Sequence, residues 1–438
     1  MLNPDVHRHV RHNFAVNLTD ACFFGFGLGF SSSVTVVPLF VDTLTDSTTL
    51  IGLIASVQLV GWQLPQILTA ERVAGLRRFL PMVLRMTLHE RWPYLVLALV
   101  ALLLPVLGAQ VTLALTFLLL CWQAIGGGLT ATAWQSMVAH IIPVNRRGTF
   151  WGTQSAGASL FKSVGSFGAG FLLVALPYPY NFAACFAATT ILMAISWGFL
   201  AWTREPERTL ATPVLPRRET RRLAWMQMRT ILRGDANVWV FMLARIGANL
   251  AWMAVAFYTI YGTREFGISE ATAGALFGML TLAQTVSSPF LGWLGDRVGH
   301  RRMFAMGALM LSASALVAIL AQSANWLIGA FILAGLGYPA ILTIAMTMTL
   351  EFGNEENRPY YIGLTNTLIA PATLVAPLVG GWLADVFGFA FTFALAGGAG
   401  LVTALLLLFV VRDPQPRSVI SEIVPAVIEP PVTQAATD

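Results

Sequence analysis

Three ionisable side chains lie inside long apolar stretches of the sequence, where a charge is costly unless it faces a partner, a cavity or a ligand. They are Asp20, Lys162 and Arg245. Lys162 is the only lysine in the chain and stands in a run of glycine, serine, alanine and phenylalanine. A carboxylate can carry a proton, and a base can neutralise that carboxylate or attract an anion. The sequence therefore predicts a buried charged site, with Asp20 as the candidate proton carrier.

Two interpretations of Asp20 are consistent with the sequence. In the first, Asp20 neutralises Lys162 or Arg245 in a buried ion pair that only holds helices in register. In the second, protonation of Asp20 frees its basic partner, and the freed cation attracts substrate or loosens one half of the protein from the other. One acid and two bases leave a surplus positive charge, which favours an organic anion as the ligand.

Other polar and aromatic side chains in the apolar stretches are further candidates for contacts with a substrate. Amide side chains can bind a solute but also link helices, and aromatic rings can bind amphipathic compounds but also pack. These candidates are Asn17, Gln123, Gln135, Asn249 and Trp252. No Walker loop, nucleophile elbow or paired metal ligands occur in the sequence, so we predict no cofactor, no metal and no enzymatic activity.

The elements that hold these residues are predicted to be membrane-spanning helices. Apolar residues make up 56% of the chain and charged residues only 11%, and soluble proteins rarely have this composition. A helix of about 20 residues crosses the hydrocarbon core of a bilayer. We predict spans at residues 14–41, 49–69, 92–108, 111–141, 150–176, 181–203, 238–262, 270–294, 303–322, 325–350, 360–384 and 388–411. The predicted fold class is an all-α integral membrane protein with twelve transmembrane helices in two six-helix halves.

Charge and composition divide the chain further. We predict a cytoplasmic tail at residues 1–12, a first half at 13–203, a linker at 204–236, a second half at 237–411 and a disordered tail at 412–438. The linker sequence RRETRRLAWMQMRTILR predicts a basic amphipathic helix on the membrane surface. Of the 25 arginines, all except Arg245 and Arg264 are assigned to one side. Positive residues in short loops stay cytoplasmic, so both termini are predicted to lie in the cytoplasm, at a cell membrane.

The loop after the eighth predicted span reads GWLGDRVGHRR. Its glycines permit a tight turn between helices, and its aspartate can accept hydrogen bonds from an arginine or from a nearby helix N-terminus. This segment resembles the loop signature of the major facilitator superfamily, whose members are secondary transporters with two six-helix halves. The matching residues are Gly292, Asp296, Arg297, Gly299, Arg301 and Arg302.

The first half contains a weaker copy of this loop. In QILTAERVAGLRRF, Glu71 and Arg72 stand where Asp296 and Arg297 stand in the second half, at a constant offset along the chain. The glycine pattern is altered there, which makes a gating contact in the first half doubtful. The same offset applied to Asp20 leads to Arg245, so the acid and the base are predicted to occupy equivalent positions.

A second pair of loops also repeats. Arg147 and Gly152 match Arg358 and Gly363, and both matches share one offset, which is shorter than that of the first pair of loops. Internal duplication of this kind is common in transporters.

The resemblance implies alternating access, in which the two halves rock about a central site lined by spans 1, 4, 7 and 10. It implies a small organic solute as substrate and protons as the driving ion. The expected partners are that solute, protons and the lipid bilayer, with no nucleic acid, and the chain is expected to be a monomer. Two alternatives remain beside this prediction: efflux of amphipathic compounds by proton antiport, and a membrane sensor or binding scaffold that does not transport.

Overall fold

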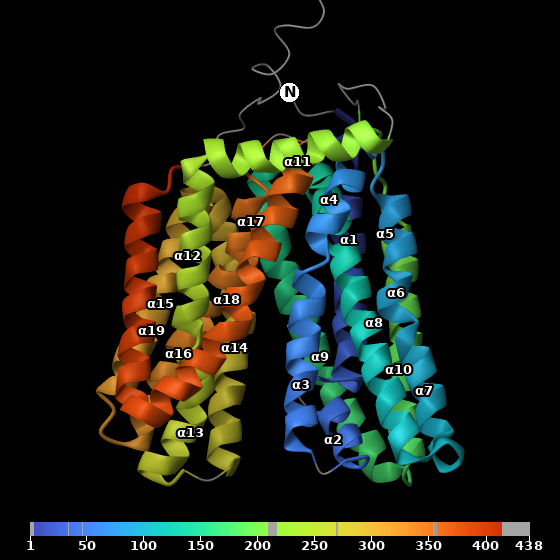
Figure 1. Cartoon of the computed structure of the whole chain (residues 1–438), viewed down its shortest axis with the longest axis vertical. Helices are drawn as coiled ribbons and strands as arrows, with labels where there is room; N and C mark the ends of the chain where they lie inside the picture. The colour runs from blue at the N-terminus through green and yellow to red at the C-terminus, as the bar shows by residue number, and fades with distance from the viewer. Residues whose placement is uncertain are drawn as a thin grey trace, which may run out of the picture.

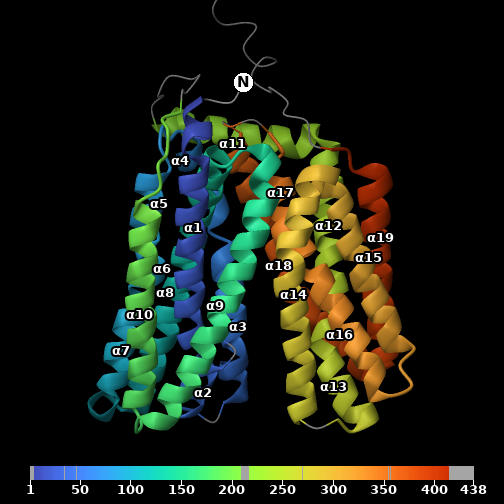
Figure 2. The same ribbon diagram turned by 180° about the vertical axis from the view of Figure 1, so that it is seen from behind.

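The protein is described by a computed structural model that covers residues 4–33, 35–45, 47–208, 217–268, 270–353, 355 and 357–413. All regular structure in these residues is helical, and the helices form two groups that stand side by side (Figures 1 and 2). The tail predicted to be disordered lies outside the described residues from position 414 onward. The fold class predicted from the sequence is confirmed.

The first group contains ten helices in the described residues. They are α1 (Pro4–Phe30), α2 (Val36–Asp42), α3 (Thr48–Gln63), α4 (Gln66–Ala74), α5 (Leu80–Met86), α6 (Leu88–Arg91), α7 (Pro93–Leu102), α8 (Leu104–Ile141), α9 (Arg147–Ala175) and α10 (Tyr180–Ala201). Helix α1 begins ten residues before the predicted span, inside the segment predicted to be a tail.

The linker forms a helix, as predicted. Helix α11 (Arg217–Gly234) lies across one end of the molecule and passes over both groups (Figure 1). Helix α1 begins and helix α19 ends at this same end, which we call the terminal end; the opposite one is the distal end.

The second group contains eight helices in the described residues. They are α12 (Ala236–Trp252), α13 (Val255–Phe266), α14 (Glu270–Val298), α15 (His300–Ile319), α16 (Ala324–Pro339), α17 (Ala345–Thr349), α18 (Arg358–Phe387) and α19 (Phe389–Leu405). Short π-helical segments, Ala340–Ile344 and Leu406–Val410, join α16 to α17 and extend α19.

Eight helical runs of the described chain are long and apolar enough to cross a membrane by length and composition. They correspond to the fourth to seventh and ninth to twelfth predicted spans. The first, second and third predicted spans are built from shorter consecutive helices, and the eighth corresponds to α14. The twelve predicted stretches therefore all fall on helical segments.

The third predicted span begins too late in the sequence. The sequence analysis placed it at residues 92–108, whereas the helical path runs from Leu80 through α5, α6 and α7 into the start of α8. It ends at Gly108, whose φ of 75° breaks α8. Arg91 lies eleven residues into this path, at a depth of about 16 Å. The charged residues 89–91 lower the local hydropathy, so the sequence analysis assigned them to a loop.

The two halves share a clamp between their first and last helices. In the first half, Asn13 Nδ2 donates to the carbonyl oxygen of Arg204 and Asn13 Oδ1 accepts from the Arg204 amide, both at 2.9 Å. In the second half, Asn237 makes the same two hydrogen bonds with Arg412, at 2.9 and 2.7 Å. Asn13 and Asn237 therefore occupy equivalent positions in the two halves. The difference between their residue numbers is the offset that relates the first helix of one half to the first helix of the other.

The offset from Asn13 to Asn237 is one position shorter than the offset from Glu71 to Asp296. The predicted equivalence of Asp20 and Arg245, which used the longer offset, is therefore wrong. The position equivalent to Asp20 is Ala244, and Arg245 is the next residue along the helix. One residue rotates a side chain by about 100° around a helix, because an α-helix has about 3.6 residues per turn. Asp20 and Arg245 therefore do not occupy equivalent positions, and they point to different surroundings.

The predicted match of Arg147 with Arg358 is supported by a second shared contact. Arg147 donates through Nη2 to the carbonyl oxygen of Ala139, and Arg358 donates through Nε to that of Leu350 at 2.9 Å. Ala139 and Leu350 are related by the same offset as the two arginines. In each half a buried arginine thus satisfies a carbonyl at the end of the preceding helix.

Candidate functional site

Asp296 joins the two halves at the terminal end. Its carboxylate accepts hydrogen bonds from the amides of Gly148 and Thr149 and from the Thr149 hydroxyl, each at 2.7 Å. These amides belong to the first turn of α9, whose N–H groups have no partners within the helix. A carboxylate also interacts favourably with the positive end of the helix dipole. Of the two partners that the sequence allowed for this aspartate, an arginine or a helix N-terminus, the structure shows the helix N-terminus.

Small residues let α9 and α14 approach closely beside this contact. A methyl group on Gly292 would overlap the carbonyl oxygen of Gly148, and one on Gly152 would overlap that of Ser288. Gly292 is therefore required for the crossing of these helices, whereas Gly299, with φ of 102°, permits the turn into α15.

His300, which belongs to the second half like Asp296, contacts the Asp296 carboxylate. Its Nε2 lies 3.3 Å from Asp296 Oδ1, and its Nδ1 lies 2.5 Å from Glu351 Oε1. The other charged residues of the loop point elsewhere. Arg297 lies 3.9 Å over the Trp293 ring, Arg301 pairs with Asp413 at 3.0 Å, and Arg302 is exposed.

The first-half copy of the loop lacks the corresponding contact. Glu71 forms no hydrogen bond or ion pair with any described residue, and Arg72 is exposed. The residue equivalent to Gly148 is Pro359, at the first turn of α18, and proline has no N–H to donate. The two loops therefore differ in chemistry as well as in sequence.

A second contact between the halves forms a chain of hydrogen bonds. Gln66 of α4 accepts from Asn366 Nδ2 of α18 at 2.7 Å, and Asn366 Oδ1 accepts from Arg245 Nη1 of α12 at 3.1 Å. Arg245 also donates to the Thr349 hydroxyl at 3.3 Å. Arg245 is predicted from the sequence, but neither amide is, because the two amides lie on separate helices that only folding brings together.

The linker and the loop before α18 supply a third contact. Glu355 lies 3.4 Å from His140 of α8 and 4.0 Å from Arg208, and its backbone oxygen accepts from Arg208 at 2.7 Å. The hydrogen bond to His140 outweighs partial burial and, with Arg358 and Arg208 nearby, holds the pKa of Glu355 at about 2. This acid is therefore ionised at physiological pH.

Asp20 lies inside the first half, and its ionic partner is neither base named by the sequence analysis. Arg91 Nη2 lies 3.3 Å from Asp20 Oδ1, and the Ser196 hydroxyl donates to the same oxygen at 2.6 Å. Arg91 also donates to the Met193 carbonyl oxygen at 3.3 Å. The Asp20 and Arg91 side chains are only 7% and 8% exposed. The sequence alone does not predict Arg91 as the partner, because the low hydropathy around this residue is typical of a loop.

Lys162 and Arg245 have no acidic partner among the described residues. Lys162 is half-buried on α9 and forms no hydrogen bond or ion pair there. Its backbone packs against Gly29 of α1, so the long side chain starts inside the first half. Within the part of the chain that the structure describes, the Arg245 side chain donates hydrogen bonds only to neutral oxygen atoms.

The remaining candidates have mixed surroundings. Asn17 is buried in the first half and donates to Thr203 Oγ1 at 3.1 Å. Asn249 donates to the Arg245 carbonyl oxygen at 2.9 Å, and the Trp252 ring lies 4.3 Å from that of Tyr338. Gln123 and Gln135 are buried with side-chain atoms that lack a partner: Oε1 of Gln123, and both polar atoms of Gln135.

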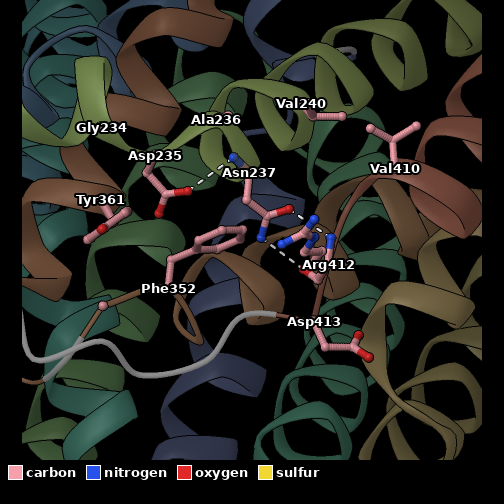
Figure 3. Close-up of a pocket in the computed structure, with 11 residues that line it drawn as sticks. Gly234, Asp235, Ala236, Asn237, Val240, Phe352, Tyr361, Val410, Arg412 and Asp413 are labelled. Carbon is pink, nitrogen blue, oxygen red and sulfur yellow. Dashed lines mark hydrogen bonds between the residues drawn. The ribbon is translucent and has the colours of Figure 1, made fainter.

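A cavity of about 530 Å³ opens at the terminal end of the second half (Figure 3). Asp235, Asn237, Phe352, Tyr361 and Arg412 are among the residues that line it. In Figure 3, Asp235 bonds to the start of α12 and Asn237 to Arg412. None of the residues predicted to contact a substrate lines this cavity.

Comparison with known proteins gives a sequence match to part of the chain. Residues 242–432 match the model of the Major Facilitator Superfamily. Multidrug resistance protein 2 of Bacillus subtilis is 25% identical over 146 residues, which are 33% of this chain and 36% of that protein. The quinolone resistance protein NorA of Staphylococcus aureus is 20% identical over 152 residues, or 35% and 39%. These matches thus span little more than a third of each relative.

Comparison with solved structures covers nearly the whole chain. The transporter FucP in its outward conformation has a TM-score of 0.73 at 14% identity, over 90% of this chain and 97% of that one. The human organic anion transporter MFSD10 has a TM-score of 0.69 at 16% identity, over 92% and 100%. The two-half architecture is therefore the fold of these two transporters, and residues 242–432 match the model of the Major Facilitator Superfamily in sequence.

Proposed function

We propose that the protein is a secondary transporter, not an enzyme, that moves a small organic solute across the cell membrane by alternating access, coupled to protons. This proposal rests on where the contacts between the two halves lie. Asp296, Gln66 and Glu355 all make their contacts toward the terminal end. In the distal parts of α9 and α14, Phe171 is 72% exposed and Leu282 is 64% exposed. Two halves whose hydrogen bonds, as far as the described residues show, gather toward one end are suited to rocking about a central site.

The arginine distribution supports a cytoplasmic position for the terminal end and both termini. With this orientation, the described arrangement is closed toward the cytoplasm and faces outward. The fold similarity to the outward conformation of FucP agrees with this assignment. The transporter acts as a monomer in this proposal, because its two halves lie within one chain.

For the substrate we propose an organic anion. Lys162 and Arg245 carry positive charge without an acid partner among the described residues, and an anion would neutralise it. Efflux of amphipathic compounds is the second candidate. The Trp252 and Tyr338 rings favour it, as do the names of relatives that confer multidrug and quinolone resistance.

Purified protein in lipid vesicles tests the transport proposal. We expect an imposed pH gradient to drive uptake or efflux of at least one compound from a panel of carboxylates, phosphates and amphipathic cations. A carboxylate or phosphate as the transported compound would support the anion assignment, whereas transport of cations alone would contradict it. Binding of a compound without flux of any panel member would contradict transport and favour a sensor.

A further inference from the structure

Glu90 is a second carboxylate within the first half, where it is half-buried, and none of the roles described above involves it. It lies on α6, in the middle of the third helical path, directly before Arg91. The Arg91 guanidinium is occupied by Asp20, Ser196 and a carbonyl oxygen. Within the described part of the chain, no lysine, arginine or histidine lies within ion-pair distance of Glu90. Its hydrogen bond comes from the Thr87 hydroxyl, at 3.4 Å.

A run of three glycines in α8 makes room for this carboxylate. At Gly126, a methyl group would lie 2.5 Å from the carbonyl carbon of His89, so the missing side chain lets α6 approach α8. At Gly127, a methyl group would lie 2.9 Å from Glu90 Oε1 and 3.4 Å from Cδ1 of Trp62. The Glu90 carboxylate and the Trp62 ring thus flank the same glycine, and the carboxylate uses the space that this glycine leaves.

Among the groups that contact Glu90, no positive charge is left to neutralise an ionised carboxylate. Asp20 of α1 and Arg91 of α6 neutralise each other, and an ionised Glu90 would add one negative charge. The other groups facing it are neutral: Thr87 on its own segment, Tyr94 of α7, and the Trp62 ring of α3. An isolated charge in a membrane interior is costly. Addition of one proton to the carboxylate removes this charge and needs no other reactant.

We propose that Glu90, held against Gly127, is the proton-binding site of this protein, and that Asp20 serves to neutralise Arg91. The coupling role of this site rests on the proposed transport function. Trp62, which flanks Gly127, accepts a hydrogen bond through its backbone oxygen from Gln66 at 3.0 Å. Gln66 in turn contacts Asn366 of the other half at 2.7 Å. Protonation at Glu90 therefore acts next to a helix that touches the second half.

Infrared difference spectroscopy of the full-length protein in lipid vesicles tests the site with protons as the only probe. Between about pH 5 and pH 9, exposed carboxyl groups stay ionised. We expect one carboxylic-acid band to titrate in this range and to vanish in Glu90→Gln. The exposed Glu265 provides the control, because Glu265→Gln should keep the band. Gly127→Ala should shift the midpoint of the titration, whereas Gly198→Ala should not, since no atom lies near that glycine.

A band that persists unchanged in folded Glu90→Gln would overturn the proposal, as would the absence of any titrating band in the wild-type protein. If Glu90→Gln does not fold, Glu90→Asp replaces it, and an unshifted midpoint in that variant contradicts the assignment. Gradient-driven flux in the vesicles separates this inference from the transport proposal. Lack of flux in the wild type counts against transport, whereas the infrared band still decides the site.

Discussion

At the scale of single residues, the Asp20–Arg91 pair determines the packing of α1, α6 and α10. In Asp20→Asn the Arg91 guanidinium would stay buried without a counter-charge. Loss of one partner of a buried pair costs about 3–5 kcal/mol. We therefore expect a clear fall in the melting temperature of the purified protein, measured by thermal unfolding in detergent.

The double variant Asp20→Asn with Arg91→Gln is the control for this prediction. It removes both charges and should recover most of the lost stability. A single Asp20→Asn variant as stable as the wild type would show that the pair has no structural role.

Lys162 gives the opposite expectation, because it has no partner among the described residues. Lys162→Gln should change the melting temperature little, since no ion pair is lost. If Lys162 binds an anionic substrate, the same variant should weaken binding of transported carboxylates about tenfold or more, as loss of a hydrogen bond to a charged group costs about 1.5–3 kcal/mol. Thermal unfolding and concentration-dependent uptake measure the two effects. Strong destabilisation with unchanged uptake would contradict the assignment.

The residue types of the candidate site could be predicted from the sequence, but their partners could not. An aspartate or arginine in an apolar stretch is visible in the sequence, and Asp20 is indeed buried, whereas Arg245 is half-buried. The partner of Asp20 lies 71 residues away, on a segment whose charges made it look like a loop. Hydropathy averages over a window, so it cannot distinguish a charged loop from a helix whose charges are neutralised by neighbouring helices.

At the scale of helices, Asp296 and its repeat counterpart Glu71 form a matched pair for experiment. Asp296→Asn keeps the shape of the side chain but removes the charge from the N-terminus of α9. Such charge-assisted bonds contribute about 1–2 kcal/mol, which corresponds to a population change of about 5–30-fold. We expect the terminal end to open more often, measured by labelling of a cysteine introduced at Ser288, which is buried on α14 next to Gly152 of α9.

Glu71→Gln should leave this labelling unchanged, because Glu71 contacts no described hydrogen-bond donor and α18 begins with Arg358–Pro359. Equal effects of the two substitutions would contradict the asymmetry between the halves.

The Glu355 carboxylate, in the contact between α8 and the loop before α18, should stay ionised across the physiological pH range. The pKa of Glu355 is lowered from 4.5 to about 2. A lowered pKa means that the contact is fully stabilising above the unfolded value of 4.5 and is lost as pH falls through about 2. Thermal unfolding of the purified protein measures this contribution: Glu355→Gln should lower the melting temperature at about pH 7, and its difference from the wild type should shrink as pH falls toward about 2. A Glu355→Gln variant as stable as the wild type at about pH 7 would contradict this prediction.

At the scale of the whole molecule, duplication made the architecture predictable. The two loop offsets predicted two related halves, and the shared asparagine clamp and arginine contacts support them. The offset differs by one position in the first helix, which was enough to misalign Asp20 with Arg245. Loop patterns therefore predict the number of repeats better than they predict which helix face a side chain occupies.

The end at which the halves touch depends on the relative free energies of alternative arrangements, which local sequence patterns do not reveal.

In the proposed mechanism, the terminal end and the distal end open and close reciprocally. Pulsed electron paramagnetic resonance tests it with spin labels at exposed positions of α9, α14 and their loops: Arg146 with Arg297 at the terminal end, and Phe171 with Phe277 at the distal end. On changing pH or adding a transported compound, the distal distance should shorten as the terminal distance lengthens. Distances that stay fixed under every condition, or that lengthen together, would contradict the account.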